Sequence, residues 1–413
     1  MRILKISDVY FPRVNGVSTS IETFRRDLAE LGHEVVLVAP SYSGGGADPL
    51  ETADPSIRRV PARAVPRDPE DRIMSWGGLR RALGELARNK FDVVHIHTPF
   101  LAHYAGIEFA RAQGTPVVAT YHTLFEEYLH HYVPLLPRRI TGAVARRFSR
   151  SQCNQLDAVI APSQAMRQAL LAYGIHKRIE ILPTGLPADR FQAGDGAAFR
   201  RRHGLKQEQP LLLFVGRTAH EKNIGFLLGM MLELRKRRPD ALLLIAGEGP
   251  AAPSLRAQAT RLGLDGSVHF LGYFDRHGEL QDCYSAADIF VFSSLTETQG
   301  LVLLEAMAQG VPVVAIPRMG TIDILGPGLG CRQAPEDREG FAQVVYDLLA
   351  DAGARNALGA QAREYAHTWA SIRMAQRLSA LYASLARPNT PAGPSTEART
   401  GAVGGTPPGR GPP

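Results

Sequence analysis

Residues 289–310, IFVFSSLTETQGLVLLEAMAQG, contain a buried strand, a polar loop and an apolar helix in direct succession. The strand ends at Ser294, which places Glu297 in the loop at its carboxyl end. Gly300 begins the helix, where the missing side chain lets the backbone approach a ligand and the helix N-terminus offers free N–H groups. A strand, loop and helix of this kind indicate a parallel α/β sheet that binds its ligand at the carboxyl ends of the strands.

Glu305 lies inside this helix, eight positions after Glu297. Carboxylates on either side of the turn can hold sugar hydroxyls by charge-assisted hydrogen bonds. The alternative is one glutamate that caps the helix and one that is solvated. The apolar neighbours of Glu305 favour a binding site, because a carboxylate in such surroundings is costly unless it has a partner.

A second polar loop, GRTAHEKN at 216–223, directly follows the strand LLLFV. Arg217 and Lys222 therefore stand at the carboxyl end of a strand, beside the N-terminus of the next helix. Two cations in that position suit a diphosphate, and the alternative is a pair of solvated loop charges. The two glutamates downstream favour the diphosphate site.

The first half of the chain contributes weaker signals. His122 ends the strand PVVATYHT, where it can face a ligand, whereas His95 and His97 lie within VVHIHTP and are interpreted as core or supporting residues. The loop at 10–18 contains one glycine, Gly16, and opens a helix, so it can cradle a phosphate. An ordinary strand–helix turn is the alternative.

The chain repeats its alternation of β-branched runs and helices twice, on either side of a polar, weakly patterned segment at 193–210. We therefore expect two doubly wound domains, at residues 1–200 and 201–368. A helix at 369–387 is expected to pack back on the first domain. Residues 388–413 hold 7 Pro and 6 Gly and predict a disordered tail.

Composition excludes several classes of protein. The 413 residues carry a formal net charge of +7, which suits an anionic partner, but no nucleic-acid-binding motif accompanies it. No apolar run approaches the roughly 18 residues of a membrane-spanning helix. Cys153, Cys283 and Cys331 show no metal-binding spacing and predict free, buried thiols in a reducing cytoplasm. The chain contains no Asp-x-Asp, so no metal site is predicted.

These motifs together resemble the family 4 retaining glycosyltransferases, whose GT-B architecture has two Rossmann-like domains facing across a cleft. The resemblance covers the chain from Met1 to about Arg387. TETQGLVLLEAMAQG is similar to the Glu-x7-Glu segment of the family, VGRTAHEKN to its Arg/Lys segment, and FPRVNGVSTSIETFRRDLAELGHEV to its opening. The resemblance implies a first domain that binds the acceptor and a second that binds a sugar nucleotide.

For the second domain, the resemblance implies a role for each motif residue. Glu305 would hold the ribose of the nucleotide. Glu297 would contact hydroxyls of the donor sugar, assisted by the backbone N–H groups of Gly300 and Leu301. Gln299 departs from the family, which usually has an aromatic residue at that position, and this leaves the shape of the sugar pocket open.

The resemblance also implies how the diphosphate is held. Arg217 and Lys222 would bind it, with Gly16 approaching from the first domain and His122 beside the donor sugar near the reacting carbon. The two cations would take the place of a metal in neutralising the leaving group, so no metal or cofactor is expected. No carboxylate nucleophile is evident, which favours front-side attack by the acceptor hydroxyl with retention of configuration.

A basic segment between Glu127 and Asp157 contains no acidic residue. On a helical wheel Arg139, Arg146 and Arg150 fall within roughly 40° of one another, and two further arginines flank them less tightly. Ile140, Val144 and Phe148 form a separate apolar stripe. Such a helix can lie on an anionic bilayer, and the alternative is a surface helix packed on its own domain. The five arginines are Arg138, Arg139, Arg146, Arg147 and Arg150.

The region from Tyr121 to Ser163 is similar to the bacterial diacylglycerol glucosyltransferases of the family. This likeness implies transfer of a hexose, glucose in the first instance from UDP-glucose, to diacylglycerol by a cytoplasmic protein associated peripherally with the inner face of the cell membrane. A GDP-mannose-dependent mannosyltransferase acting on a lipid or polysaccharide stays open. A sugar-nucleotide epimerase and a non-catalytic sugar-nucleotide-binding protein are alternatives of other classes.

Overall fold

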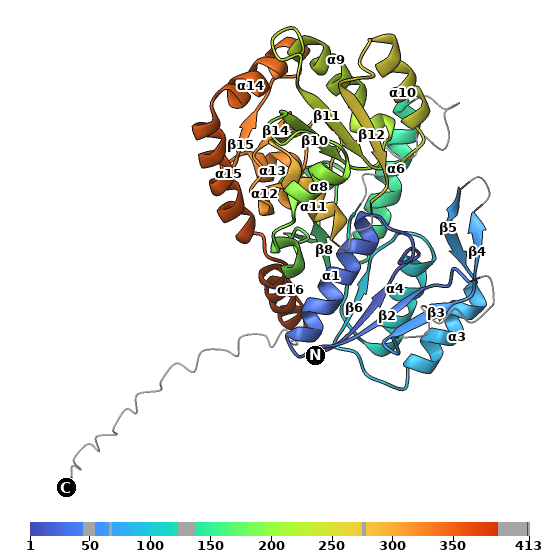
Figure 1. Ribbon diagram of the computed structural model, residues 1–413. Helices are drawn as coiled ribbons and strands as arrows, with labels where there is room; N and C mark the ends of the chain where they lie inside the picture. Colours follow the sequence, from blue (N-terminus) through green and yellow to red (C-terminus); the bar gives the residue numbers. More distant parts are fainter. Residues whose placement is uncertain (44–53, 66–67, 123–137, 275–277, 387–410, 412–413) are drawn as a thin grey trace.

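The computed structural model describes residues 1–43, 54–65, 68–122, 138–274, 278–386 and 411. They form two α/β domains, each built around a parallel sheet (Figure 1). Runs of Val, Ile and Leu form strands that are covered on both faces, because helical crossovers between parallel strands place helices on each side. The predicted fold class, two doubly wound domains in series, is confirmed.

The first sheet has seven parallel strands in the order β3-β2-β1-β6-β7-β8-β9. Its strands are β1 (Arg2–Ile6), β2 (Glu34–Pro40), β3 (Ile57–Val60), β6 (Val93–Ile96), β7 (Val117–Thr120), β8 (Ala158–Ala161) and β9 (Arg178–Ile181). The helices of this domain are α1 (Gly16–Glu30), α3 (Trp76–Leu86), α4 (Leu101–Gln113), α6 (Arg138–Cys153) and α7 (Gln164–Ala172). A separate antiparallel pair is formed by β4 (Ala62–Val65) and β5 (Asp68–Met74).

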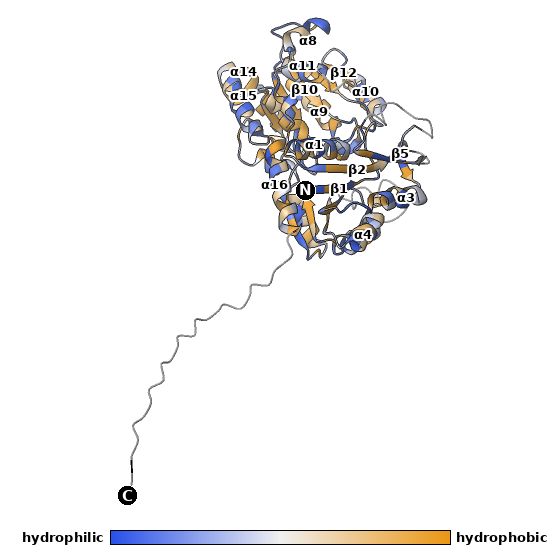
Figure 2. Ribbon diagram, turned by 90° about the horizontal axis from the view of Figure 1, so that it is seen from below, coloured by the Kyte–Doolittle hydropathy of each residue, from blue (hydrophilic) through white to orange (hydrophobic). Residues whose placement is uncertain are grey.

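The second sheet has six parallel strands in the order β12-β11-β10-β13-β14-β15. Its strands are β10 (Leu211–Val215), β11 (Leu242–Ala246), β12 (Val268–Gly272), β13 (Ile289–Phe292), β14 (Val313–Ala315) and β15 (Cys331–Gln333). Its helices are η1 (Ala188–Phe191), α8 (Gly196–Arg202), η2 (His220–Lys222), α9 (Ile224–Leu234), α10 (Ala252–Arg261), α11 (Glu279–Ala286), α12 (Leu301–Ala308), α13 (Thr321–Leu325), α14 (Arg338–Ala350) and α15 (Ala352–His367). Figure 2 shows hydrophobic residues gathered around β10 and α9, with hydrophilic residues on α8 at the periphery.

The last helix, α16 (Ser371–Ala386), returns to the first domain and lies beside α1 (Figure 1). Met374 and Leu378 on α16 share one buried cluster with Ile3 on β1 and Phe24 on α1. The cluster covers one face of the first sheet, so the final helix completes a core that the first domain alone would leave open to water.

Two chain segments connect the domains and run side by side. Leu186, on the first connector, donates its N–H to the carbonyl of Trp369 at 2.7 Å and accepts from the N–H of Ser371 at 2.9 Å. A side chain on Gly185 would place a Cβ only 2.3 Å from the Cα of Ser371. The connectors therefore pack backbone to backbone, which requires glycine at this point.

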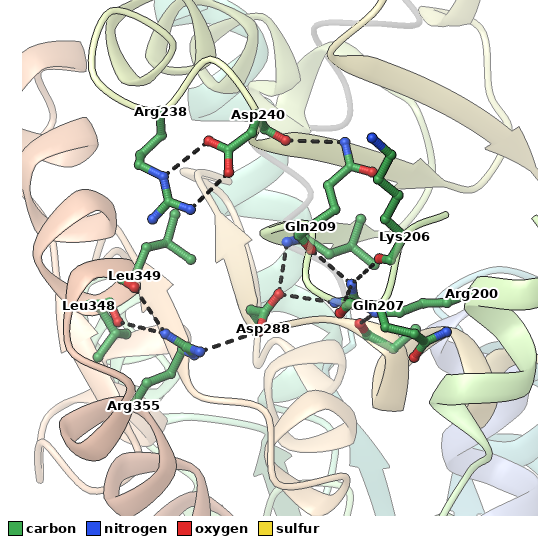
Figure 3. Close-up of polar contacts among 12 residues, drawn as sticks. Arg200, Lys206, Gln207, Gln209, Arg238, Asp240, Asp288, Leu348, Leu349 and Arg355 are labelled. Atoms are coloured by element: carbon green, nitrogen blue, oxygen red, sulfur yellow. Dashed lines mark hydrogen bonds and ion pairs between the residues drawn. The ribbon is translucent and has the colours of Figure 1, made fainter. Parts of the chain in front are cut away.

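The domain boundary lies earlier than the sequence indicates. Phe199, assigned to the end of the first domain, is fully buried in the core of the second. The polar segment 193–210 is held there by Arg200, whose guanidinium bonds Asp288 at 3.0 Å and also donates to four backbone carbonyls (Figure 3). The polar segment predicts a domain boundary, but its hydrogen bonds to α11 and to Asp288, directly before β13, make it part of the second domain.

Free, buried thiols are confirmed for Cys153, Cys283 and Cys331. Burial raises the pKa of Cys153 to about 12 and also raises the pKa of Cys331. These thiols stay protonated at neutral pH and pack as small apolar groups. The tail predicted at 388–413 lies, apart from Gly411, outside the described residues.

Candidate active site

The loop that carries Arg217 and Lys222 leaves the carboxyl end of β10 and rests on the loop that follows β11. Thr218 donates its N–H to the carbonyl of Glu248 at 2.9 Å. A Cβ on Gly247 would lie 2.0 Å from the carbonyl oxygen of Gly216. Glycine at 247 thus lets the two loops touch and places Arg217, which is exposed, at the edge of the sheet.

Lys222 and Glu297 form an ion pair, with 2.5 Å between Nζ and Oε1. The side chains are 22% and 14% exposed, so the pair is partly shielded from water yet reachable. Lys222 comes from η2 after β10, and Glu297 from the loop after β13, the strand next to β10 in the sheet. Strand order therefore joins two site residues predicted from separate motifs.

The turn that carries Lys222 is fastened to the Glu297 loop by residues to which the sequence analysis assigns no role. Asn223 adopts a left-handed conformation, with φ of 54°, and its Nδ2 donates to the carbonyl of Ser293 at 3.3 Å. The hydroxyl of Ser293 in turn donates to the carbonyl of Asn223 at 3.0 Å. Asn tolerates this conformation better than most residues, so the Lys-Asn sequence is the signal that was available.

Gly300 has φ of 95° and immediately precedes α12, which begins at Leu301. The turn before α13 packs against the loop that holds Glu297, since Gly320 donates its N–H to the carbonyl of Glu297 at 2.9 Å. A Cβ on Gly320 would stand 2.1 Å from the carbonyl oxygen of Thr298. The first N–H groups of α12 thereby lie directly after the loop that holds Glu297.

Glu305 is 6% exposed, and its Oε2 accepts a hydrogen bond from the Tyr284 hydroxyl at 2.8 Å. Tyr284 lies on α11 and is itself buried. The bond offsets part of the cost of burying a carboxylate. The role of Glu305 as a ribose ligand stays a prediction, and its tyrosine partner has no signal in the helix sequence.

His122 follows β7 and stacks on His97, with 3.1 Å between His122 Nε2 and His97 Nδ1. Burial lowers the pKa of His122 to about 3, and the charge of Lys5 adds to this effect. His122 is therefore a neutral imidazole at neutral pH and carries no imidazolium proton to donate. His95, also buried, bonds the Tyr382 hydroxyl at 2.6 Å.

Gly16 is the exposed first residue of α1. Among the described residues, no hydrogen bond or ion pair joins Gly16 or His122 to the Lys222–Glu297 pair. The two domains instead meet near the site through Thr184 and Gln299, and through Asp323, which accepts the N–H of Gln164 at 2.7 Å.

Lys5 is fully buried beneath α1, and its ammonium lies 5.4 Å from the ring centroid of Phe24. Burial lowers its pKa to about 7, partly offset by the nearby charge of Glu22. The unfolded chain holds this proton up to about pH 10.4, so the free energy of unfolding should rise with pH from about 7 to about 10.

Lys5→Met is therefore expected to raise the melting temperature at about pH 6 and to raise it much less at about pH 9. At about pH 6 the parent protein buries a charged ammonium, and at about pH 9 the buried amine is already neutral, so the substitution removes a smaller cost. Thermal unfolding of both proteins across this range checks the expectation. Parallel curves for the two proteins would contradict it.

Part of the basic surface predicted on α6 is exposed to solvent. Arg147 and Arg150 are exposed and Arg146 is half-buried, while the side chains of Arg138 and Arg139 lie outside the described residues. Among the described helices, none combines the length and hydropathy needed to cross a bilayer.

The apolar stripe predicted on α6 faces the domain only in part, since Phe148 is half-buried and the side chain of Ile140 lies outside the described residues. Val144 is 54% exposed, whereas Ala145 and Ser149 are buried. Ser149 bonds the Tyr121 hydroxyl at 2.7 Å, and a small, polar face lets α6 approach the domain closely. This arrangement leaves Val144 outward on a helix that also exposes Arg147 and Arg150. The segment 123–137, expected to shelter acyl chains, lies outside the described residues.

Within the described residues, no group of three His, Cys, Asp or Glu side chains is arranged to hold a metal ion. A hollow of about 540 Å³ beside α12 and α15 contains none of the predicted site residues. It is lined by Gln309, Gly310, Gly359, Ala360, Arg363, Glu364 and His367.

Family models match both halves of the chain. Residues 14–190 match the model described as Glycosyltransferase Family 4, and residues 195–365 match Glycosyl transferases group 1. The chain is 32% identical to an alpha-monoglucosyldiacylglycerol synthase of Streptococcus pneumoniae, over 76% of this chain and 71% of the relative. It is 31% identical to a GDP-mannose-dependent alpha-mannosyltransferase of Mycobacterium tuberculosis, over 79% of this chain and 82% of the relative.

Solved structures share the fold at lower identity. Sucrose-phosphate synthase from Thermosynechococcus elongatus superposes with a TM-score of 0.76 at 22% identity, over 93% of this chain and 99% of that protein. Anabaena HepE in complex with UDP gives a TM-score of 0.73 at 17% identity, over 93% of this chain and 100% of that protein. The chain therefore belongs to the family 4 glycosyltransferases and has their GT-B architecture of two parallel-sheet domains.

Proposed function

We propose that this protein is a retaining glucosyltransferase that moves glucose from UDP-glucose to diacylglycerol at the inner face of the cell membrane. The observation that carries the proposal is the Lys222–Glu297 pair at the carboxyl ends of neighbouring strands. A cation suited to phosphate stands there beside a carboxylate suited to sugar hydroxyls. The likeness to the streptococcal synthase supports the choice of sugar and acceptor.

In this proposal, Arg217 and Lys222 hold the diphosphate with the N-terminus of α1 at Gly16, and negative charge that develops on the leaving phosphate is stabilised there. Glu297 and the first N–H groups of α12, at Gly300 and Leu301, orient the sugar.

Glu305 would hold the ribose, and neutral His122 would hydrogen-bond the donor sugar. These two contacts fix the donor at both ends, so that its reacting carbon faces the acceptor.

The reaction we propose is a front-side displacement. The bond between C1 of the sugar and the phosphate oxygen breaks, and the acceptor oxygen bonds to C1 on the same face. The hydroxyl proton passes to the departing phosphate oxygen, so the configuration is retained and all atoms balance. Isolation of a covalent glycosyl–enzyme adduct would contradict this step.

No metal takes part in the proposed reaction, because Arg217 and Lys222 supply the positive charge at the leaving group. Addition of EDTA is expected to leave the rate of sugar transfer unchanged. A loss of activity that Mg²⁺ or Mn²⁺ restores would contradict metal independence.

The test of donor and acceptor mixes the protein with anionic liposomes that contain diacylglycerol and one of four labelled donors: UDP-glucose, UDP-galactose, UDP-glucuronate or GDP-mannose. Label in the lipid phase with UDP-glucose is the expected result. Label from GDP-mannose would support the second candidate, a mannosyltransferase, which the likeness to the mycobacterial enzyme favours. Conversion of the donor without any acceptor would indicate an epimerase, and binding without turnover a sensor.

Membrane binding is proposed for the exposed side of α6. Replacing Arg147 and Arg150 by serine is expected to weaken binding to anionic vesicles roughly thirtyfold at low salt, at about 1 kcal/mol for each arginine near the surface. Arg81→Ser with Arg88→Ser removes the same charge from exposed positions on and after α3 and serves as the control. Vesicle sedimentation measures both, and equal binding by the two double variants would contradict the proposal.

A further inference from the structure

Gln299 bonds both backbone groups of one residue in the connector between the domains. Its amide oxygen accepts the N–H of Thr184 at 2.8 Å, and its Nε2 donates to the carbonyl of Thr184 at 2.6 Å. Gln299 is 6% exposed and Thr184 is 7% exposed, so water cannot replace these bonds. The side chain thus pairs with the connector as a neighbouring strand would.

Thr184 extends the contact to the first domain. Its hydroxyl donates to the hydroxyl of Ser20 on α1 at 2.7 Å, and Ser20 is 2% exposed. Ser20 lies one turn after Gly16, the first residue of α1. In the second domain, Gln299 lies two positions after Glu297 and two positions before α12 begins at Leu301. The bonds therefore run from the donor loop of the second domain, through the connector, to the start of α1.

A primary amide is the group that this position demands. It offers one acceptor and one donor side by side, which match the carbonyl and N–H of a single extended residue. An aromatic side chain, usual at this position in the family that the sequence resembles, or a methionine, would leave both buried backbone groups of Thr184 without partners.

We propose that Gln299 is a positioning residue, which holds the Glu297 loop in register with the N-terminus of α1 through Thr184 and Ser20. The inference rests on the proposed function, in which these two elements bind one donor molecule from opposite domains. Gln299 touches no reacting atom in this account. It determines how the two halves of the donor site lie relative to each other.

Gln309, at the other end of α12, is a matched control. It is also 6% exposed, accepts the N–H of Gly194 at 3.0 Å and donates to the carbonyl of Arg190 at 2.8 Å. These partners lie after Leu186, within the second domain as the structure defines it. Gln309 therefore joins α12 to η1 and the segment after it, and η1 in turn reaches α1 through the exposed Arg26–Asp189 ion pair at 3.7 Å, of a kind that contributes little.

The experiment compares Gln299→Met, Gln309→Met, Ser20→Ala and the two double variants that combine each glutamine change with Ser20→Ala. Calorimetry measures the dissociation constants of UDP and GDP, kinetics measure KM and kcat, and thermal unfolding measures stability. Both glutamine changes are expected to lower the melting temperature. Of these two glutamine changes, only Gln299→Met is expected to raise the donor KM, by about tenfold, with a smaller change in kcat.

Coupling distinguishes positioning from simple stability. If Gln299, Thr184 and Ser20 act as one connection, Ser20→Ala should add little to the KM effect of Gln299→Met, a departure from additivity of about threefold or more. The effects of Ser20→Ala and Gln309→Met should add. Thr184→Val, which replaces the hydroxyl by a methyl group and keeps both backbone bonds to Gln299, tests the link to Ser20 if Gln299→Met fails to fold.

A parent protein that binds neither UDP nor GDP would overturn the proposed function itself. If the parent protein binds a nucleotide and Gln299→Met has the same KM and dissociation constant as the parent, the positioning role alone would be overturned. Additive effects of Gln299→Met and Ser20→Ala would likewise overturn it.

Discussion

Replacing Lys222 by alanine is expected to lower kcat for sugar transfer by about two to three orders of magnitude, with little change in the melting temperature. The ammonium lies 2.5 Å from Glu297 and is the partly buried cation of the candidate site. Removal of one preorganised group that stabilises developing charge typically costs about a hundred- to a thousandfold in kcat. The variant also leaves Glu297 without its counter-charge, so the carboxylate that we propose as the sugar ligand is held less firmly.

Steady-state kinetics at saturating donor, with circular dichroism to confirm folding, measure this effect. Lys236→Ala is the control, since Lys236 pairs with Glu233 in a more exposed ion pair and such surface pairs contribute little. Lys222→Arg keeps the charge and should recover part of the rate. A rate near that of the parent in Lys222→Ala would remove this residue from the active site.

Replacing Arg200 by methionine is expected to lower the free energy of unfolding by about 3 to 5 kcal/mol, the largest stability effect that we predict. Nη1 of this one side chain donates to the carbonyls of Lys206, Gln207 and Gln209, and Nε donates to Ala286 at 2.9 Å (Figure 3).

Nη2 pairs with Asp288 at 3.0 Å, and Arg200 is 6% exposed. Methionine fills similar volume but leaves a half-buried carboxylate and four carbonyls without this donor. Among the residues that the structure describes, the Asp288 carboxylate then keeps Arg355, at 3.7 Å, and the N–H of Leu211. Urea denaturation with linear extrapolation measures the loss.

Arg202→Met is the control, because Arg202 lies on the same helix and bonds Asp282 at the exposed surface. Similar stability losses in the two variants would contradict the role assigned to Arg200.

The strands and the motif loops could be predicted from local sequence. Buried runs such as LLLFV and IFVFSS have few alternatives to a parallel strand, because both faces of such a strand must be apolar. Polar loops that follow them necessarily emerge at the carboxyl edge of the sheet. Glu297, Lys222 and Gly300 are therefore located by patterns of fewer than ten residues each.

Other features depend on residues that are far apart in the chain. The Gln299–Thr184 contact joins positions 115 residues apart, and the Arg200–Asp288 pair joins positions 88 apart. Nothing in the local pattern around Arg200 distinguishes it from its neighbours Arg201 and Arg202, so the sequence places the domain boundary inside a segment that belongs to the second domain.

The sequence by itself determined that this chain forms two parallel α/β sheets with polar loops at their carboxyl edges, since hydrophobic periodicity is a local property. Only the tertiary structure decided which polar side chains are buried, which face of α6 meets the domain, and that Gln299 connects the two domains. The physical reason is that a buried polar group is stable only with a partner, and the partner is brought near by the fold.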